Sequence, residues 1–171
     1  MPIYVLGNRV PDIHPDAYIH PDAVIIGDVH VGAESSVWPG AVLRGDYGTI
    51  IVGERTSIQD GAIIHAIADF PTVIGSDCVV GHLAHLEGCV IHDRALVGSG
   101  SVVLHEAEVH SGATVGAGAV VRNRMQVPAG SLAVGVPADI RWDASNEEMI
   151  IEAAAMYVMN AHRYRAELRP L

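Results

Sequence analysis

The stretch that decides the fold is "IHDRALVGSGSVVLHEAEVHSGATVGAGAVV", residues 91–121. Every sixth residue in it is aliphatic, and we call these positions the ruler residues: Ile91, Val97, Val103, Val109, Val115 and Val121. The residue four places after a ruler residue is usually small, as at Ala95 and Ser101, and glycine often follows the ruler residue directly. An inward aliphatic side chain, a small residue four places on and turn formers between them predict a short strand with a bend, repeated along the chain.

The six-residue period covers roughly residues 10–138. Outside the first stretch the ruler residues are Ile13, Ile19, Ile25, Val31, Val37, Leu43, Val52, Ile58, Ile64, Ile74, Val80, Leu86, Val127 and Ala133. Three such turns close one triangular coil, and the pattern resembles the hexapeptide left-handed β-helix, an exception to right-handed crossovers. We therefore predict an all-β fold, a left-handed parallel β-helix of about seven coils over residues 1–138, followed by a C-terminal segment, 139–171, with an α-helix packing on it.

The period is interrupted at three places. Three residues are added after the turn that starts at Leu43, four are added after the turn of Ile64, and one is missing after the turn of Leu86. Each interruption falls between the third turn of a coil and the first turn of the next. We expect all of them at one corner of the prism, where insertions leave the stack intact and often lie near a binding surface.

The stretch "SNEEMIIEAAAMYVMNAHRYRAEL", residues 145–168, predicts the C-terminal helix. Ser145 with Glu148 has the spacing of a capping box. The recurrence of Met149, Ala153 and Met156 predicts an apolar face that covers the prism or a neighbouring one. Trp38 is expected at a subunit interface.

Composition limits the partners and the location. The net charge is −10, from 20 acidic residues against 10 basic ones that are all arginine, which argues against binding nucleic acid. The chain shows neither a signal peptide nor an apolar run long enough to cross a bilayer, so we expect a cytoplasmic protein without a membrane partner. Cys78 and Cys89 are expected to be small buried hydrophobes.

Polar residues gather at equivalent positions of successive coils. Arg44, His65 and Glu87 each directly follow a third-turn ruler residue, so all three should point outward from one face. With coils about 4.8 Å apart, His65 and Glu87 could share one metal ion. Asp60 and His82 stack in the same way on second turns, with Gln59 adjacent, and belong to a different face.

One prism cannot bring both faces to the same ion, because their outward normals diverge by roughly the 120° of a triangular section. Three chains about a three-fold axis can, because the third-turn face of one chain then meets the second-turn face of the next. The spacing thus predicts a homotrimer with three interfacial metal sites.

The segments "VWPGAVLRGDYGTIIVGERTSIQDGAIIH" at 37–65 and "IGSDCVVGH" at 74–82 resemble the γ-class carbonic anhydrases and their bacterial homologues. The resemblance implies that His65 and His82 are zinc ligands from adjoining subunits and that Gln59 orients the zinc-bound solvent. It also implies an interfacial ionic network of the residues Arg44, Asp46 and Asp60. Tyr157 resembles a helix tyrosine that reaches toward the site in relatives.

The chain departs from that family at the third ligand. The family's second histidine in G-H-x-x-x-x-H would fall at 87, where this chain has Glu87, with a histidine instead at His85. Stacking favours Glu87, because His85 is expected at a corner from which it would need a local distortion to reach the ion. Two histidines and one carboxylate suit Zn²⁺ and equally Fe²⁺.

The resulting functional hypothesis is reversible hydration of carbon dioxide to bicarbonate by a metal-bound hydroxide. Glu87 reduces the net charge on the metal, so the enzyme is expected to be slow or inactive. Two alternatives stay open. One is a hexapeptide-repeat acyltransferase with His85 or His105 as general base, and the other is a trimeric scaffold without metal.

Overall fold

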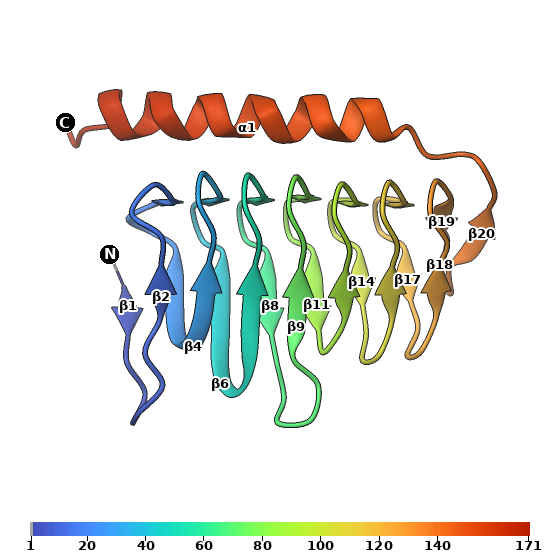
Figure 1. The fold of residues 1–171 in the computed structure, drawn as a ribbon, viewed down its shortest axis with the longest axis horizontal. Helices are drawn as coiled ribbons and strands as arrows, with labels where there is room; N and C mark the ends of the chain where they lie inside the picture. Colours follow the sequence, from blue (N-terminus) through green and yellow to red (C-terminus); the bar gives the residue numbers. More distant parts are fainter. Residues whose placement is uncertain (1) are drawn as a thin grey trace.

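In the computed structural model, which describes residues 2–171, the chain winds into a left-handed parallel β-solenoid of about seven coils (Figure 1). The first turns of successive coils form β2 (Asp12–Ile13), β4 (Val24–Val31), β6 (Val42–Val52), β9 (Thr72–Ile74), β12 (Val90–Ile91), β15 (Glu108–Val109) and β18 (Gln126–Val127). The second turns form β3 (Tyr18–Ile19), β5 (Ser36–Val37), β7 (Ser57–Ile58), β10 (Val79–Val80), β13 (Leu96–Val97), β16 (Thr114–Val115) and β19 (Leu132–Val134). The third turns lie in β4 and β6 and in β8 (Ile63–His65), β11 (His85–Glu87), β14 (Val102–Val103) and β17 (Val120–Val121), with β1 (Ile3–Tyr4) paired to β4 at the N-terminal end.

The strand register aligns the ruler residues in three columns. On second turns, for example, Ile58 pairs with Val80 and Val80 with Val97. Every ruler residue is buried except Ile13, which packs partly buried against the same core. Because alternate residues of a strand point to opposite faces, the residue before and after each ruler residue points outward. The predicted fold and the predicted grouping of the turns are both confirmed.

The interruptions gather at the predicted corner, between third and first turns. There β4 and β6 run round the corner as single strands, with an irregularity in their pairing between Gly27 and Val29. Gly27 has a φ of +78°, and a side chain on it would lie 2.3 Å from the Gly45 carbonyl oxygen. After β8 the chain protrudes in a loop, residues 66–71, closed by a bridge between Ile67 and Phe70 (Figure 1).

The C-terminal helix α1 (Glu147–Glu167) lies along the second-turn sheet, where it contacts β3, β5, β7 and β10 (Figure 1). Its buried residues are Ile150, Ala154 and Ala161, while Met149 and Met156 are exposed. The prediction of the apolar face was therefore wrong, because the buried face of the helix is shifted by one residue along the chain. Under the C-terminal half of the helix, Tyr18 and Trp38 of the solenoid pack against Ala161, with Tyr157 and Tyr164 beside them.

Trp38 is the centre of that surface. It is buried under α1, with its indole in edge contact with Tyr157 and Tyr164 at centroid distances of 5.8 and 5.1 Å. The indole N–H donates to the Ser36 and Ser57 hydroxyls at 2.9 and 3.0 Å. The expectation that Trp38 lies at a subunit interface was wrong, because the chain's own helix covers it.

The helix begins with Asn146, whose side-chain oxygen accepts a hydrogen bond from the Met149 N–H at 3.1 Å. The predicted capping box was wrong, because the Ser145 hydroxyl instead pairs with the Thr114 hydroxyl at 2.7 Å. Between the solenoid and the helix, β20 (Asp139–Arg141) pairs antiparallel with β19. The C-terminal segment thus begins inside the sheet and then crosses to the helix.

Replacing Asn146 with alanine is expected to lower the free energy of unfolding by about 1 kcal/mol, because the helix loses its N-cap acceptor. Chemical denaturation followed by circular dichroism measures this. Asn146→Asp is the control, since aspartate caps equally well and is expected to keep the stability of the unmodified chain. A loss as large for aspartate as for alanine would contradict the assigned cap.

Candidate functional site

Three neighbouring strands on the third-turn face carry the first group of predicted site residues. Arg44 of β6 pairs in register with His65 of β8, and His65 pairs with Glu87 of β11. All three side chains therefore stack outward in one column, as the ruler predicted. The strands hold this column rigidly because the residues before them, Leu43, Ile64 and Leu86, are fully buried in the core.

The His65 ring is held between two carboxylates. Its Nδ1 lies 2.7 Å from Glu87 Oε1, and its Nε2 lies 3.0 Å from Asp46 Oδ1. The Arg44 guanidinium donates to the other Asp46 oxygen. Behind the ring, the Thr72 hydroxyl donates to the His65 carbonyl at 2.5 Å and accepts from the Gly88 N–H at 2.8 Å. These contacts fix the position and the orientation of the imidazole.

Both carboxylates are held in their ionised form. Burial alone would raise the pKa of Glu87, but the hydrogen bond and positive charge of His65, with smaller contributions from His105 and His85, bring that pKa below its usual value. Burial likewise opposes the ionised form of Asp46, and hydrogen bonds from His65 and Arg44 lower its pKa. An anionic oxygen and an imidazole nitrogen at the same place are the donor chemistry that zinc and ferrous iron accept.

Two further histidines surround Glu87. His85 lies two residues before it on the same face of β11, with Nε2 3.5 Å from Glu87 Oε2. We had expected His85 at a corner. Because it instead begins the strand, its ring reaches Glu87 without distortion of the backbone.

His105, from the turn after β14, approaches the same carboxylate oxygen to 3.6 Å. Its ring stacks on Phe70 with centroids 6.1 Å apart. Gly88, at φ +61°, makes room for this stack, since a side chain there would lie 2.9 Å from both Phe70 and His105. Within residues 2–171 the buried Nε2 of His105 has no hydrogen-bond partner. The sequence suggested His105 only as a general base. It gave no sign of the stack with Phe70, because the two residues lie far apart along the chain.

The second group lies on the second-turn side, beside α1. His82 Nδ1 is 3.0 Å from Asp60 Oδ2, and both side chains are about half exposed. Gln59 is buried next to them. Tyr157 and Trp38 complete a small cavity of about 170 Å³ with Asp60 and His82. Burial, and then the negative charge of Asp60, raise the pKa of Tyr157, against a hydrogen bond from Gln59 that lowers it.

A single chain keeps the two groups apart. His65, Glu87, Asp46 and Arg44 occupy the third-turn face, while His82, Asp60, Gln59 and Tyr157 occupy the second-turn side. Apolar side chains are exposed between the two groups, at Leu83 with 71% and Ile63 with 40% of the side chain accessible. The separation agrees with the geometric argument that one prism cannot gather all the predicted ligands.

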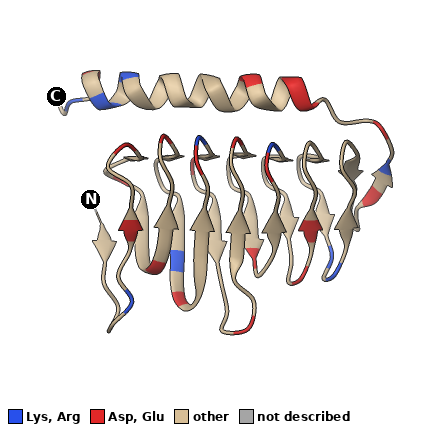
Figure 2. Cartoon of the chain, viewed as in Figure 1, with Lys and Arg blue, Asp and Glu red and all other residues tan. Residues whose placement is uncertain are grey.

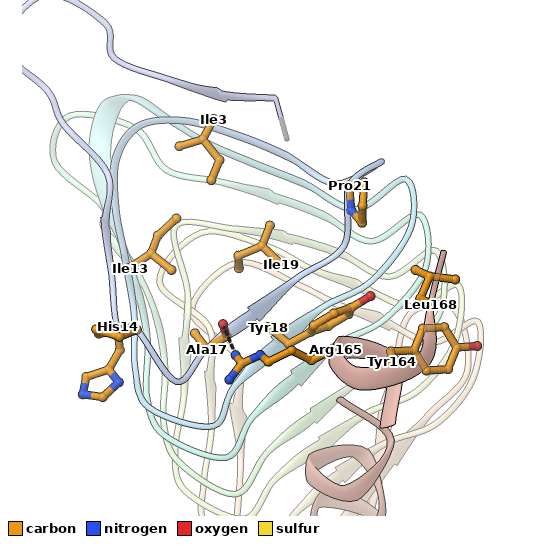
Figure 3. A pocket seen from close by; sticks show the side chains of 11 residues that line it. Ile3, Ile13, His14, Ala17, Tyr18, Ile19, Pro21, Tyr164, Arg165 and Leu168 are labelled. Carbon is orange, nitrogen blue, oxygen red and sulfur yellow. Dashed lines mark hydrogen bonds between the residues drawn. The ribbon is translucent and has the colours of Figure 1, made fainter. Parts of the chain in front are cut away.

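A larger cavity of about 620 Å³ lies at the open N-terminal end of the solenoid (Figure 3). Ile3, Ile13 and Ile19 line its apolar interior, and Tyr164 and Arg165 of α1 stand at its rim. Arg165 donates to the Ala17 and Asp16 carbonyls at 2.7 and 3.0 Å, which ties the end of α1 to the first coil. None of the predicted ligands lines this cavity.

The arginines are dispersed over the solenoid and α1 rather than gathered on one face (Figure 2). Half of them pair with acidic residues: Arg9 with Asp28, Arg44 with Asp46, Arg55 with Asp77, Arg94 with Glu147 and Arg124 with Glu106. Within the part of the chain that the structure describes, no helix is both long and apolar enough to cross a membrane.

The two cysteines lie inside the solenoid. Both are buried, and desolvation raises the pKa of each thiol to about 12. A neutral, buried thiol is a poor nucleophile and a poor metal ligand. The prediction that Cys78 and Cys89 act as small hydrophobes is confirmed.

Comparison with known proteins finds the same six-residue repeat in a described family. The family model described as bacterial transferase hexapeptide (six repeats) matches residues 11–45, 71–105 and 88–123. The carnitine operon protein CaiE of Citrobacter koseri is 42% identical over 149 residues, which cover 87% of this chain and 76% of CaiE.

Solved structures show the same architecture. The hexapeptide transferase family protein from Anaplasma phagocytophilum superposes with a TM-score of 0.91 at 34% identity, over 95% of this chain and 98% of that one. A mutant perosamine N-acetyltransferase from Caulobacter crescentus, solved with CoA and GDP-perosamine, gives a TM-score of 0.57 at 28% identity. That match covers 79% of this chain and 58% of the acetyltransferase.

Proposed function

Since the chain belongs to the bacterial transferase hexapeptide family and is related to CaiE, we propose that it is a γ-carbonic anhydrase-like metalloprotein that works as a homotrimer. Its metal ligands would be His65 and Glu87 of one subunit and the partner's His82. Zn²⁺ is the proposed ion and Fe²⁺ the alternative. The reaction is the hydration of carbon dioxide to bicarbonate.

One observation carries the proposal, the contact of 2.7 Å between His65 Nδ1 and Glu87 Oε1 on stacked strands. Two metal-ligating atoms lie together there, while the other predicted histidine ligand, His82, is outward-facing on another side of the prism. Exposed Leu83 and Ile63 lie between them, and burying them against a neighbour would favour assembly. A closed three-fold ring repeats one such contact three times.

The chain's own residues have distinct tasks in this proposal. Asp46, held by Arg44, fixes the imidazole of His65 so that the ring presents a constant orientation. A zinc ion with an open position would supply the Lewis acidity that makes water nucleophilic near neutral pH. Gln59, which lies beside His82, would orient the attacking water from the subunit that supplies His82. His85, whose side chain is about one-third exposed, is placed to carry the released proton to solvent.

A second candidate function is acyl transfer from an acyl-coenzyme A. The observation that favours it is the approach of His105 to Glu87, at 3.6 Å, because a carboxylate that orients a histidine is the usual arrangement of a general base. The perosamine N-acetyltransferase with bound CoA shares the solenoid. Against it, the arginines of the described residues are dispersed along the chain and half of them pair with acids, which leaves little free positive charge for the phosphates of a coenzyme.

Metal content and hydration rate test the proposal together. Protein purified without added metal and then loaded with zinc or iron is expected to hold one ion per chain at this site and to hydrate carbon dioxide above the buffer rate. Glu87→His is expected to raise that rate by up to about tenfold, because a neutral ligand leaves more positive charge at the ion and makes water more acidic.

The contrary outcomes are distinct. Buffer-level hydration by metal-loaded trimer, and by its Glu87→His variant, would eliminate the enzymatic proposal. Acetyl-CoA binding that depends on His105, measured with a His105→Asn variant, would favour the acyltransferase instead. A trimer that binds neither metal nor acetyl-CoA would be a scaffold.

A further inference from the structure

A second cluster of metal-ligating side chains lies on the first-turn face, away from every residue used above. His92, Glu108 and His110 each offer one ligand atom, and these atoms all lie within 4.8 Å of one another. The three side chains are partly exposed, so an ion from solution can reach them. Two imidazoles and a carboxylate form a complete set of protein ligands for zinc.

The register of the solenoid produces this cluster. Ile91 of β12 pairs with Val109 of β15, so the residues that follow them, His92 and His110, are neighbours on adjacent coils. Their rings stack with centroids 4.9 Å apart and planes 5° from parallel. Glu108 lies two residues before His110 on the same face of the strand, so its side chain leans toward the same rings.

The contacts within the cluster are polar. His92 Nε2 lies 3.3 Å from Glu108 Oε2, and His110 Nε2 lies 2.7 Å from the side-chain oxygen of Gln126 on the next coil. An amide oxygen therefore stands beside the three ligating groups as a further hard donor.

The fold itself does not require histidine here. The equivalent position that follows the first-turn ruler residue is glycine in three other coils, at Gly32, Gly53 and Gly75. Two histidines in consecutive coils, with a glutamate between them in space, are a departure from the pattern that the turn needs. A lone histidine occupies the equivalent position at His14, but of the first-turn positions within residues 2–171 only those of His92 and His110 bring two rings and a carboxylate face to face, as a ligand-binding role requires.

We propose that His92, Glu108 and His110 bind a divalent late transition metal such as Zn²⁺ within one chain. The rings need only tilt from parallel to bring their nitrogens to the roughly 3.3 Å separation of a tetrahedral site with bonds of about 2.0–2.1 Å. The order of affinities among divalent ions predicts that Cu²⁺ and Ni²⁺ also bind, and Mg²⁺ does not.

The test measures zinc binding in a chain whose interfacial ligands are removed. A His65→Ala, His82→Ala double variant, titrated with Zn²⁺ by calorimetry, is expected to retain one ion per chain. Adding His92→Ala or His110→Ala to that double variant is expected to weaken the remaining binding more than about 100-fold, beyond the roughly 10–100-fold that loss of an outer-shell group costs. Co²⁺ is expected to give a visible absorption band that disappears with the same changes.

His14→Ala is the matched control, because His14 follows the first-turn ruler residue Ile13 as His92 and His110 follow theirs, but among the described residues it belongs to no cluster of three ligating groups. It is expected to leave the titration unchanged. Identical titrations with and without His92 and His110 would overturn the proposal, as would an equal loss from His14→Ala. Circular dichroism checks that each variant keeps the solenoid. Because His65 and His82 are absent from every variant in this test, a negative result would not contradict the proposed function. A negative result for the proposed function would likewise not contradict the first-turn site.

Discussion

Mixing a His65→Ala variant with a His82→Ala variant is expected to restore interfacial metal binding and hydration that neither variant shows alone. Each variant by itself lacks one ligand in every interface, so each is expected to lose the interfacial ion. In a mixed trimer, an interface is complete when a chain with intact His65 meets a neighbour with intact His82. In a random one-to-one mixture about one interface in four meets this condition.

The experiment is best carried out with both chains also bearing His92→Ala, so that the first-turn cluster does not contribute. The two chains are unfolded and refolded together, and zinc content and hydration rate are compared with separately refolded samples. Recovery of about a quarter of the zinc held by the His92→Ala protein with intact His65 and His82 would show that the site is shared between subunits. Metal retained by either variant alone, or no recovery on mixing when the chains form trimers, would contradict the shared site.

Leu86→Ala is expected to lower the free energy of unfolding by about 2–5 kcal/mol, because it leaves a cavity in a fully buried column. Leu86 lies between Ile64 and Val103 on the third-turn side, and pairing in register leaves its neighbours little freedom to move into the space. The change should also weaken metal binding, since the same strand carries His85 and Glu87. Chemical denaturation gives the first effect and zinc titration the second.

Leu6→Ala provides the comparison, because Leu6 has the same side chain but is nearly half exposed. It is expected to change the stability by no more than about 0.5 kcal/mol. Equal effects at the two positions would mean that the ruler column is not the main source of stability. A large effect at Leu86 with unchanged zinc binding would mean that the strand is held by other contacts.

The solenoid could be predicted residue by residue because its rule is local. A strand alternates inward and outward positions, so a ruler residue such as Ile64 fixes the outward direction of His65, and the repeat length fixes its neighbours in the stack. The stacked column of Arg44, His65 and Glu87 followed from this alone. So did the separation of that column from His82.

The errors arose where packing between distant segments decides the outcome. Under the C-terminal half of α1, Trp38 and Tyr18 pack against Ala161, a contact that no spacing within the helix reveals. Asn146 rather than Ser145 caps the helix, because Thr114 of β16 binds the Ser145 hydroxyl. The contact of Asp46 with His65 likewise depends on how β6 turns the corner, since Asp46 lies beyond the regular repeat.

Because α1 is attached to the solenoid at both ends, its length must match the length of the row of coils. One end is joined to the last coil through β20, and Arg165 ties the other to the first coil. Its 21 residues span about 31 Å, and each coil of about 4.8 Å corresponds to about three helical residues, less than the 3.6 of a full turn. If one coil were duplicated and three residues were added within α1 before Tyr164, the helix would turn by about 300°. Tyr164 would then point about 60° away from its present direction toward Trp38. A solenoid with one more coil would therefore need a helix of different length and phase to keep both the Arg165 contact with the first coil and the aromatic contact of Tyr164 with Trp38.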